Sequence, residues 1–138
     1  MRRAAHVDEN QPLIVAAVRL IPGVKVKPTH VVGDGFTDLV IGFRGQNFLQ
    51  EVKPPLFRGI DRRRTELNEL EQAWHEEWTG KTDVVRTVLD SYNALGLDGE
   101  REIRRREDEL VKLARRLCPR IPVAIALRGV QASTRSRP

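Results

Sequence analysis

The 138-residue sequence has little of several features, and each shortage excludes a class of protein. A single cysteine, Cys118, excludes an internal disulfide and lacks the partner ligands of a structural zinc site. No run of about 18 apolar residues occurs, so we expect no transmembrane helix and no membrane partner. The first residues contain no apolar stretch of the kind that a secretory signal needs. Together these features predict a protein of the reducing cytoplasm.

An excess of positive charge is missing from most of the chain. Residues 1–98 carry 13 Lys and Arg against 14 Asp and Glu, whereas residues 99–138 carry 11 against 5. The net charge of +5 therefore originates in the C-terminal part. A basic segment of this kind favours salt-dependent contact with nucleic-acid phosphates, and a solvated face of mixed charge is the alternative.

The most informative segment, residues 38–53, is rich in β-branched and aromatic residues on both sides of a turn sequence at 44–46, and this pattern predicts a β-hairpin. Glu51 and Lys53 are two positions apart, so their side chains point to the same face. A register that pairs Asp38 with Lys53, or equally one that pairs it with Glu51, places all three on that face. The opposite face then forms a core surface of Leu39, Ile41, Phe43, Phe48 and Val52.

The spacing Asp38-x12-Glu51-x-Lys53 resembles the active-site signature of the PD-(D/E)XK nuclease superfamily. The longer run Gly33-x-Gly35-x-x-Asp38-Leu-x-Ile-Gly-x-x-Gly45-x-x-x-Leu49-x-Glu51-Val-Lys53 is similar to the small stand-alone VRR-NUC type of phages and bacteria. Downstream, Glu71-Gln72-Ala-Trp74-His75-x-x-Trp78-x-Gly80 and then Val84-Val85-Arg86-Thr87-Val88 resemble that family's active-site helix and closing strand. The resemblance covers roughly residues 8 to 95.

The resemblance implies an α/β fold with a restriction-endonuclease-like core, in which helices flank a small mixed β-sheet. It also implies a DNA endonuclease that uses Mg²⁺ or Mn²⁺ to hydrolyse phosphodiester bonds in structured DNA (junctions, flaps or ends). Such proteins often act as homodimers, here in a bacterial or phage-infected host cell. Two alternatives stay open: a non-catalytic nucleic-acid-binding module that retains the fold, and an interaction subunit whose basic helix binds an acidic partner.

In this interpretation Asp38 and Glu51 supply the hard oxygen ligands that Mg²⁺ prefers, and the resemblance adds the Val52 backbone carbonyl. Lys53 orients the attacking water or offsets charge on the phosphoryl oxygens. Gln72 would project from the following helix and orient the phosphate.

The sequence also departs from the family pattern. Thr37 stands where the superfamily name implies proline. The family's first helix commonly brings a carboxylate to the metal, and only Asp8 or Glu9 could do so here. Asp8 is equally suited to cap the helix.

Four arginines follow the signature lysine in a loop and are candidate contacts to the DNA backbone, with an exposed loop as the alternative: Arg58, Arg62, Arg63 and Arg64. Leu67, Leu70, Trp74 and Trp78 lie along one stripe of the next helix, so we expect both tryptophans to pack against the sheet, with base-stacking platforms as the alternative. Gln72 and His75 lie off that stripe, so one of them can point at the site.

Asp98-Gly99 marks a boundary between a nuclease-like domain, 1–98, and a basic extension, 99–138. The thin apolar stripe of the extension must be covered either by the domain or by another subunit. The remaining expectations are helices at 8–20, 65–78, 89–97 and 100–117, strands at 24–28, 81–88 and 122–127, and a disordered tail at 131–138.

Overall fold

Residues 7–130 are described by the computed structural model, which has a mixed α/β architecture. No helix in this described part is long and apolar enough to cross a membrane. In chain order the elements are α1 (Gln11–Arg19), β1 (Lys25–Pro28), β2 (Leu39–Phe43), β3 (Gln46–Val52), a 3-10 turn η1 (Arg62–Thr65), α2 (Glu69–Glu77), β4 (Asp83–Val85), α3 (Val88–Ala94), α4 (Gly99–Arg105), α5 (Glu107–Leu117) and α6 (Val123–Arg128).

The four strands form one sheet in the order β1-β2-β3-β4. The first three strands are antiparallel, and β4 pairs with β3 in parallel. The β2–β3 hairpin turns through Arg44 and Gly45, whose positive φ angles of 53° and 77° match the right-handed twist of the flanking strands. The register that this two-residue turn sets continues so that Asp38 lies opposite Glu51. Of the two registers that the sequence allows, the hairpin therefore adopts the one that pairs Asp38 with Glu51 and not the one that pairs it with Lys53.

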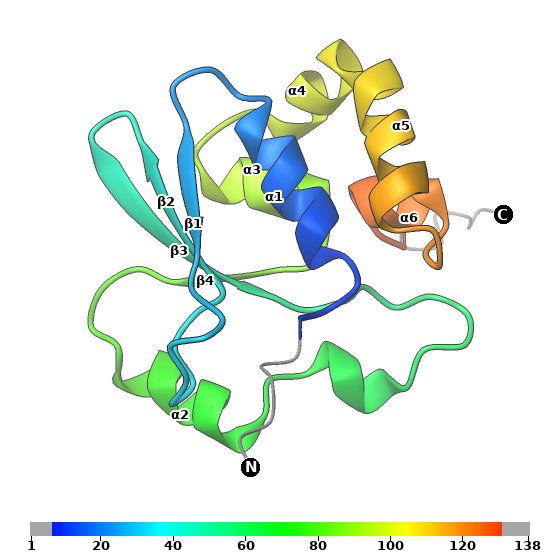
Figure 1. Ribbon diagram of the computed structural model, residues 1–138. Coiled ribbons are helices and arrows are strands. Elements are labelled where there is room, and N and C mark those ends of the chain that lie inside the picture. The colour runs from blue at the N-terminus through cyan, green and yellow to red at the C-terminus, as the bar shows by residue number, and fades with distance from the viewer. Residues whose placement is uncertain (1–6, 131–138) are drawn as a thin grey trace, which may run out of the picture.

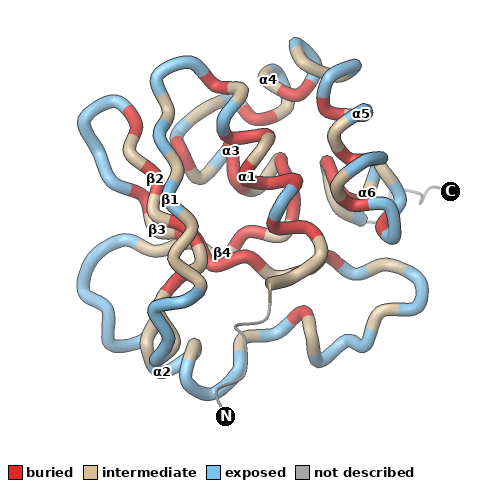
Figure 2. Tube along the Cα trace, viewed as in Figure 1, coloured by how far each residue is buried: buried red, intermediate tan, exposed pale blue. Residues whose placement is uncertain are grey.

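Helices cover one face of the sheet. Helix α1 packs on β1 and α3 packs on β4, and α4, α5 and α6 pack on these two helices (Figure 1). The buried residues fall mainly on the strands and on the helices that cover them (Figure 2). The hairpin face predicted to be apolar is buried as expected: Leu39, Ile41, Phe43, Phe48 and Val52.

Two hydrogen-bonded contacts inside this core fix α3 in place. The Ser91 hydroxyl donates to Gln50 Oε1 at 2.6 Å, and the Gln50 amide donates back to the Ser91 carbonyl at 3.3 Å. The Tyr92 hydroxyl donates to the Ala17 carbonyl of α1 at 2.7 Å. Because buried polar groups are costly without partners, these pairs fix how α3 lies between α1 and β3.

Helix α2 lies apart from the other helices and has no buried residue (Figures 1 and 2). It begins at Glu69 and not at 65, because Asn68 and Glu71 form a capping box and Thr65 ends η1. The expectation that both tryptophans pack against the sheet is wrong, since Trp78 is 42% exposed and Trp74 is only partly buried.

The segment after residue 98 shares the core of the preceding part. Ile103, Leu110, Ala114 and Leu127 belong to the same buried cluster as the sheet residues, so the domain covers the apolar stripe of the extension. The predicted helix 100–117 is two helices that break at Arg106.

The predicted strand 122–127 is wrong, because this segment forms α6. Its buried residues Ala126 and Leu127 face the core, and Pro122 precedes its first turn. The expected disordered tail, 131–138, lies outside the described residues.

Candidate functional site

A cavity of about 280 Å³ opens where the β2–β3 hairpin meets α2 and the loop between β1 and β2. Its lining residues are Asp8, His30, Gly33, Gly35, Phe36, Asp38, Glu51, Lys53, Asn68, Leu70 and Glu71. The three signature residues of the hairpin, Asp38, Glu51 and Lys53, therefore meet at one cavity, as their spacing predicts.

Backbone hydrogen bonds hold Asp38 in position at the start of β2. Its carboxylate Oδ2 accepts from the Val52 N–H at 2.8 Å, across the hairpin. Its own N–H donates to the Gln50 carbonyl at 3.2 Å, and its carbonyl accepts from the Thr29 N–H at 2.6 Å. The Asp38 carboxylate is thus fixed beside the Glu51 side chain before any ligand binds.

Glu51 is the most deeply buried acidic group of the cavity, with 1% of its surface exposed. Burial, followed by the hydrogen bond and negative charge of Asp38 and the proximity of Glu71, raises the pKa of Glu51 to about 11. Its Oε1 atom is buried and has no hydrogen-bond partner among residues 7–130. Glu51 is therefore protonated at neutral pH unless a cation offsets its charge.

Lys53 and Glu71 form the main ion pair of the cavity, with 2.7 Å between Nζ and Oε1. Burial alone would lower the pKa of Lys53, but the hydrogen bond and charge of Glu71, followed by the charge of Asp8, raise it above its usual value. Burial would likewise raise the pKa of Glu71, whereas its hydrogen bonds to Lys53 and the Asn68 N–H lower it. The amine is therefore a fixed positive charge at neutral pH, and Glu71 orients it.

His75 of α2 lies beside Glu51, although it does not line this cavity. Its Nε2 atom lies 4.0 Å from Glu51 Oε1, and neither atom has a hydrogen-bond partner in the described part of the chain. Burial lowers the pKa of His75, which the charges of Glu71 and Asp38 only partly offset. The imidazole is thus neutral at pH 7. The 4.0 Å gap beside the signature carboxylates separates His75 Nε2 from Glu51 Oε1, two polar atoms that have no hydrogen-bond partner among the described residues.

The structure does not bring Gln72 to this cavity. The Gln72 amide donates to Glu76 Oε1 at 3.2 Å on the exposed side of α2. Glu71 and His75, four positions apart, occupy the helix face that points at the hairpin. The capping box of Asn68 and Glu71 is the sequence signal that could have identified this face.

Of the two candidates for the additional carboxylate, Asp8 lines the cavity and Glu9 does not. Glu9 instead pairs with Arg64 at 3.2 Å and with Arg120 at 3.4 Å. Asp8 lies 3.7 Å from Arg64. Asp8 thus lines the cavity, whereas Glu9 belongs to a cluster of ion pairs at the edge of the cavity.

The predicted arginine loop is only partly available for a ligand. Arg63 pairs with Asp61 beside it at 2.9 Å, and Arg64 is held by the N-terminal acidic pair. Arg58 and Arg62 are exposed. These two remain the better candidates for a contact with a phosphate backbone.

One residue missed by the sequence interpretation, Asn10, joins the elements that carry the site. Its buried side-chain amide donates at 3.0 Å to the Lys53 carbonyl and at 3.0 Å to the Arg86 carbonyl. Asn10 therefore ties the start of α1 to the ends of β3 and β4. The only sequence signal is an asparagine before the helix, which usually indicates a cap.

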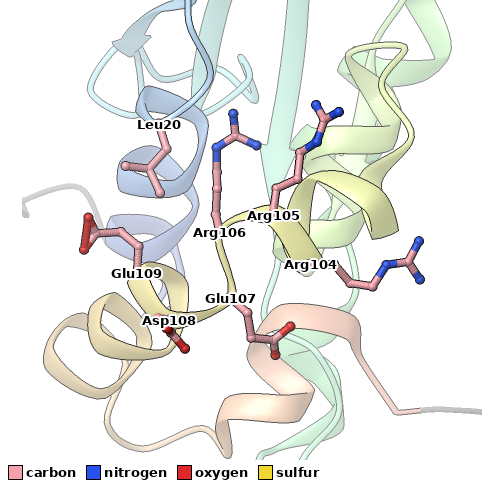
Figure 3. Close-up of a pocket in the computed structure, with 7 residues that line it drawn as sticks. All are labelled: Leu20, Arg104, Arg105, Arg106, Glu107, Asp108 and Glu109. Atoms are coloured by element: carbon pink, nitrogen blue, oxygen red, sulfur yellow. The ribbon is translucent and has the colours of Figure 1, made fainter.

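A second cavity, of about 460 Å³, lies at the α4–α5 junction (Figure 3). Its lining residues are Leu20, Arg104, Arg105, Arg106, Glu107, Asp108 and Glu109. The arginine and carboxylate side chains in Figure 3 point in different directions, and Arg106 pairs with Glu102 at 2.5 Å. Charges of both signs that do not converge on one point make this a weaker candidate than the hairpin cavity.

Within residues 7–130, no group of three or more His, Cys, Asp or Glu side chains forms a ready-made site for a metal ion. The hairpin cavity offers Asp38 and Glu51 as a pair. Comparison of the chain with family models, with curated proteins and with solved structures finds no match. The functional argument therefore depends on the geometry and chemistry of the cavity.

Proposed function

We propose that the chain is a DNA endonuclease that depends on a divalent cation and hydrolyses phosphodiester bonds. In this proposal it belongs to the PD-(D/E)XK superfamily and to its small VRR-NUC type, with a restriction-endonuclease-like core. The observation that carries the proposal is the meeting of Asp38, Glu51 and Lys53 in one cavity at the end of the hairpin. Their order and spacing resemble those of the superfamily signature.

The chemistry of the donor set suits Mg²⁺ or Mn²⁺. Mg²⁺ commonly takes one or two protein carboxylates and keeps several waters, so a pair of carboxylates is sufficient. Asp38 and Glu51 would hold the ion, and the resemblance adds the Val52 carbonyl. The unsatisfied Oε1 of Glu51 and the raised pKa of this group support the assignment, because a cation would replace the proton that the group otherwise needs. A bound divalent cation supplies Lewis-acid chemistry at a phosphate and lowers the pKa of a water molecule.

The protein residues have separate roles in this proposal. The Lys53 amine, protonated and oriented by Glu71, offsets the negative charge that develops on the phosphoryl oxygens. The Val52 N–H fixes the Asp38 carboxylate. Asp8, which lines the cavity, is the candidate for an additional carboxylate.

The partners follow from the same proposal. Arg58 and Arg62, both exposed, would contact the DNA backbone as point charges without reading sequence. The resemblance implies a homodimer in a bacterial or phage-infected cell. The substrate would be structured DNA with junctions, flaps or ends.

A non-catalytic nucleic-acid-binding module is the second candidate. The ion pair between Lys53 and Glu71 favours it, because this pair neutralises the lysine when no substrate is bound.

A cleavage assay separates the two candidates. Labelled single-stranded, linear duplex, flap and four-way-junction DNAs would be incubated with Mg²⁺, Mn²⁺ or EDTA. Asp38→Asn is the test variant, and Glu109→Gln, an exposed carboxylate on α5, is the matched control. We expect metal-dependent cleavage that Asp38→Asn abolishes and Glu109→Gln retains. DNA binding without cleavage of any substrate would favour the binding module.

A further inference from the structure

Two buried polar atoms, Nε2 of His75 and Oε1 of Glu51, lie 4.0 Å apart between α2 and the hairpin. The two side chains are only 12% and 2% exposed. Neither atom has a hydrogen-bond partner within residues 7–130. Buried polar atoms without partners are uncommon and costly, so two of them side by side indicate that a ligand binds between them.

The contacts of α2 hold His75 in this position. One helical turn earlier, Glu71 pairs with Lys53 at 2.7 Å and closes the capping box with Asn68. The His75 ring also meets the Trp74 ring edge-on, with 5.3 Å between the ring centroids. The imidazole is therefore fixed beside the hairpin before any ligand binds.

The charges around the two atoms favour a cation. The carboxylates of Glu71 and Asp38 lie close enough to interact electrostatically with His75. Residues 65–80 contain five glutamates and no lysine or arginine. His75 also lines an open hollow of about 530 Å³ together with Glu66, Leu67, Gln72 and Glu76. A cation is attracted to this acidic surface, and the hollow gives it a path to His75.

The two ligand atoms select the class of cation. An imidazole nitrogen with a carboxylate oxygen suits Zn²⁺ and Co²⁺, whereas Mg²⁺ prefers oxygen alone. Burial lowers the pKa of His75, so its Nε2 lone pair is available at neutral pH. Tetrahedral bonds of about 2.1 Å would place the two atoms about 3.4 Å apart, so the 4.0 Å separation needs to close by only about 0.6 Å. A water molecule could bond to both atoms, but it would not offset the negative charge of the neighbouring carboxylates.

We infer that Glu51 Oε1 and His75 Nε2 are two ligands of a transition-metal ion of the Zn²⁺ or Co²⁺ class. Within residues 7–130 no three side chains form a ready-made site, so waters would complete the coordination and the affinity would be below that of a structural zinc site. This position differs from the one proposed for Mg²⁺ between Asp38 and Glu51, although both use Glu51. The inference goes beyond the proposed function and does not require that the chain cleaves DNA.

Titration of Zn²⁺ into the Mg²⁺-free protein, followed by isothermal titration calorimetry, tests the inference without DNA. His75→Ala should weaken Zn²⁺ binding at least about 10-fold, since even a residue that only supports a metal ligand costs that much. The affinity for Mg²⁺, measured separately, should stay unchanged. His75→Gln is closer in size and should show a similar selective loss.

Two variants serve as matched controls and should bind Zn²⁺ like the wild type. His30→Gln replaces a histidine that lines the hairpin cavity. Glu77→Gln removes an exposed carboxylate from α2 itself. They separate coordination by His75 from a general effect of histidines or of acidic charge near the site.

Nitrogen-15 NMR of the histidine rings adds a readout that a purely structural role of His75 would not change. It needs only the wild type, so it remains decisive if the His75 variants fold poorly. Zn²⁺ bound at Nε2 leaves the ring proton on Nδ1, so the Nε2 resonance of His75 should shift as Zn²⁺ is added.

Three results would overturn the inference: no Zn²⁺ binding by the wild type, unchanged Zn²⁺ affinity in His75→Ala, or a titration that shifts other histidine rings and leaves His75 unshifted. Equal losses of Zn²⁺ and Mg²⁺ affinity would also overturn it, because His75 would then only position Glu51. The cleavage assay distinguishes this inference from the proposed function. Mg²⁺-dependent cleavage without Zn²⁺ at His75 would remove the transition-metal site only, and Zn²⁺ at His75 without cleavage would remove the nuclease only.

Discussion

Replacing Glu51 by glutamine should stabilise the cation-free protein at neutral pH. Burial and the neighbouring carboxylates raise the pKa of Glu51 to about 11, whereas the same group in the unfolded chain titrates near 4.5. Between these two values the folded state keeps a proton that the unfolded state has released. Stability contributed by this group is therefore complete below pH 4.5 and falls as the pH rises.

The magnitude follows from the linkage between protons and folding. Each pH unit above 4.5 costs the folded state about 1.4 kcal/mol, so Glu51 costs about 3 kcal/mol at pH 7. Glutamine has nearly the same shape and does not titrate. The variant should then match the wild type near pH 4.5 and exceed it by up to about 3 kcal/mol at pH 7.

Urea denaturation in EDTA between pH 4.5 and 8 measures this difference, with Glu109→Gln as the exposed control. Mg²⁺ should stabilise the wild type increasingly as the pH rises, because it binds the ionised carboxylate, and should have no such effect on Glu51→Gln. A wild type that loses no stability relative to Glu51→Gln between pH 4.5 and 7 would refute the reasoning.

Three further substitutions test how the fold holds the site. Asn10→Ala should cost about 2–3 kcal/mol in urea denaturation, because it leaves the backbone carbonyls at the ends of β3 and β4 without a donor; an unchanged midpoint would contradict this. Tyr92→Phe should cost about 1–2 kcal/mol through loss of the hydrogen bond to Ala17, and a neutral result would mean that water replaces it. Gly35→Ala should cost about 1–2 kcal/mol of stability and should lower DNA cleavage further, since the loop must move away from Leu70; wild-type cleavage would show that this approach is dispensable.

The hairpin was the most predictable part of the chain. Alternation of polar and apolar residues fixes which side chains share a face, and the core face from Leu39 to Val52 is buried as predicted. Alternation alone left two registers open. The choice depends on the turn, where Arg44 and Gly45 both adopt positive φ, and this geometry selects the pairing of Asp38 with Glu51.

The candidate site was predictable where it is local and not where it depends on distant contacts. The hairpin residues come from one stretch of sequence. The face of α2 depends on where that helix begins, and the Asn68–Glu71 capping box moves its start to Glu69. With this start Glu71 and His75 face the hairpin, and Gln72 does not.

The clearest error of the sequence-based prediction concerns a short apolar segment. Residues 122–127 alternate enough to resemble an edge strand, yet they form α6. Pro122 before the helix and Gly129 after it, with a φ of 81°, are the start and stop signals that decide between the two. The tryptophans of α2 were misjudged for a related reason, because periodicity shows which residues share a face but not what covers that face.

Titration of Mn²⁺ into the protein, followed by electron paramagnetic resonance, tests the central claim most directly, because the result does not depend on finding the right DNA. The account predicts that the wild type and Glu109→Gln bind Mn²⁺ and that Asp38→Asn and Glu51→Gln lose this binding. Equal binding by all four proteins, or no binding by the wild type, would contradict the assignment of Asp38 and Glu51 as the cation ligands of a nuclease.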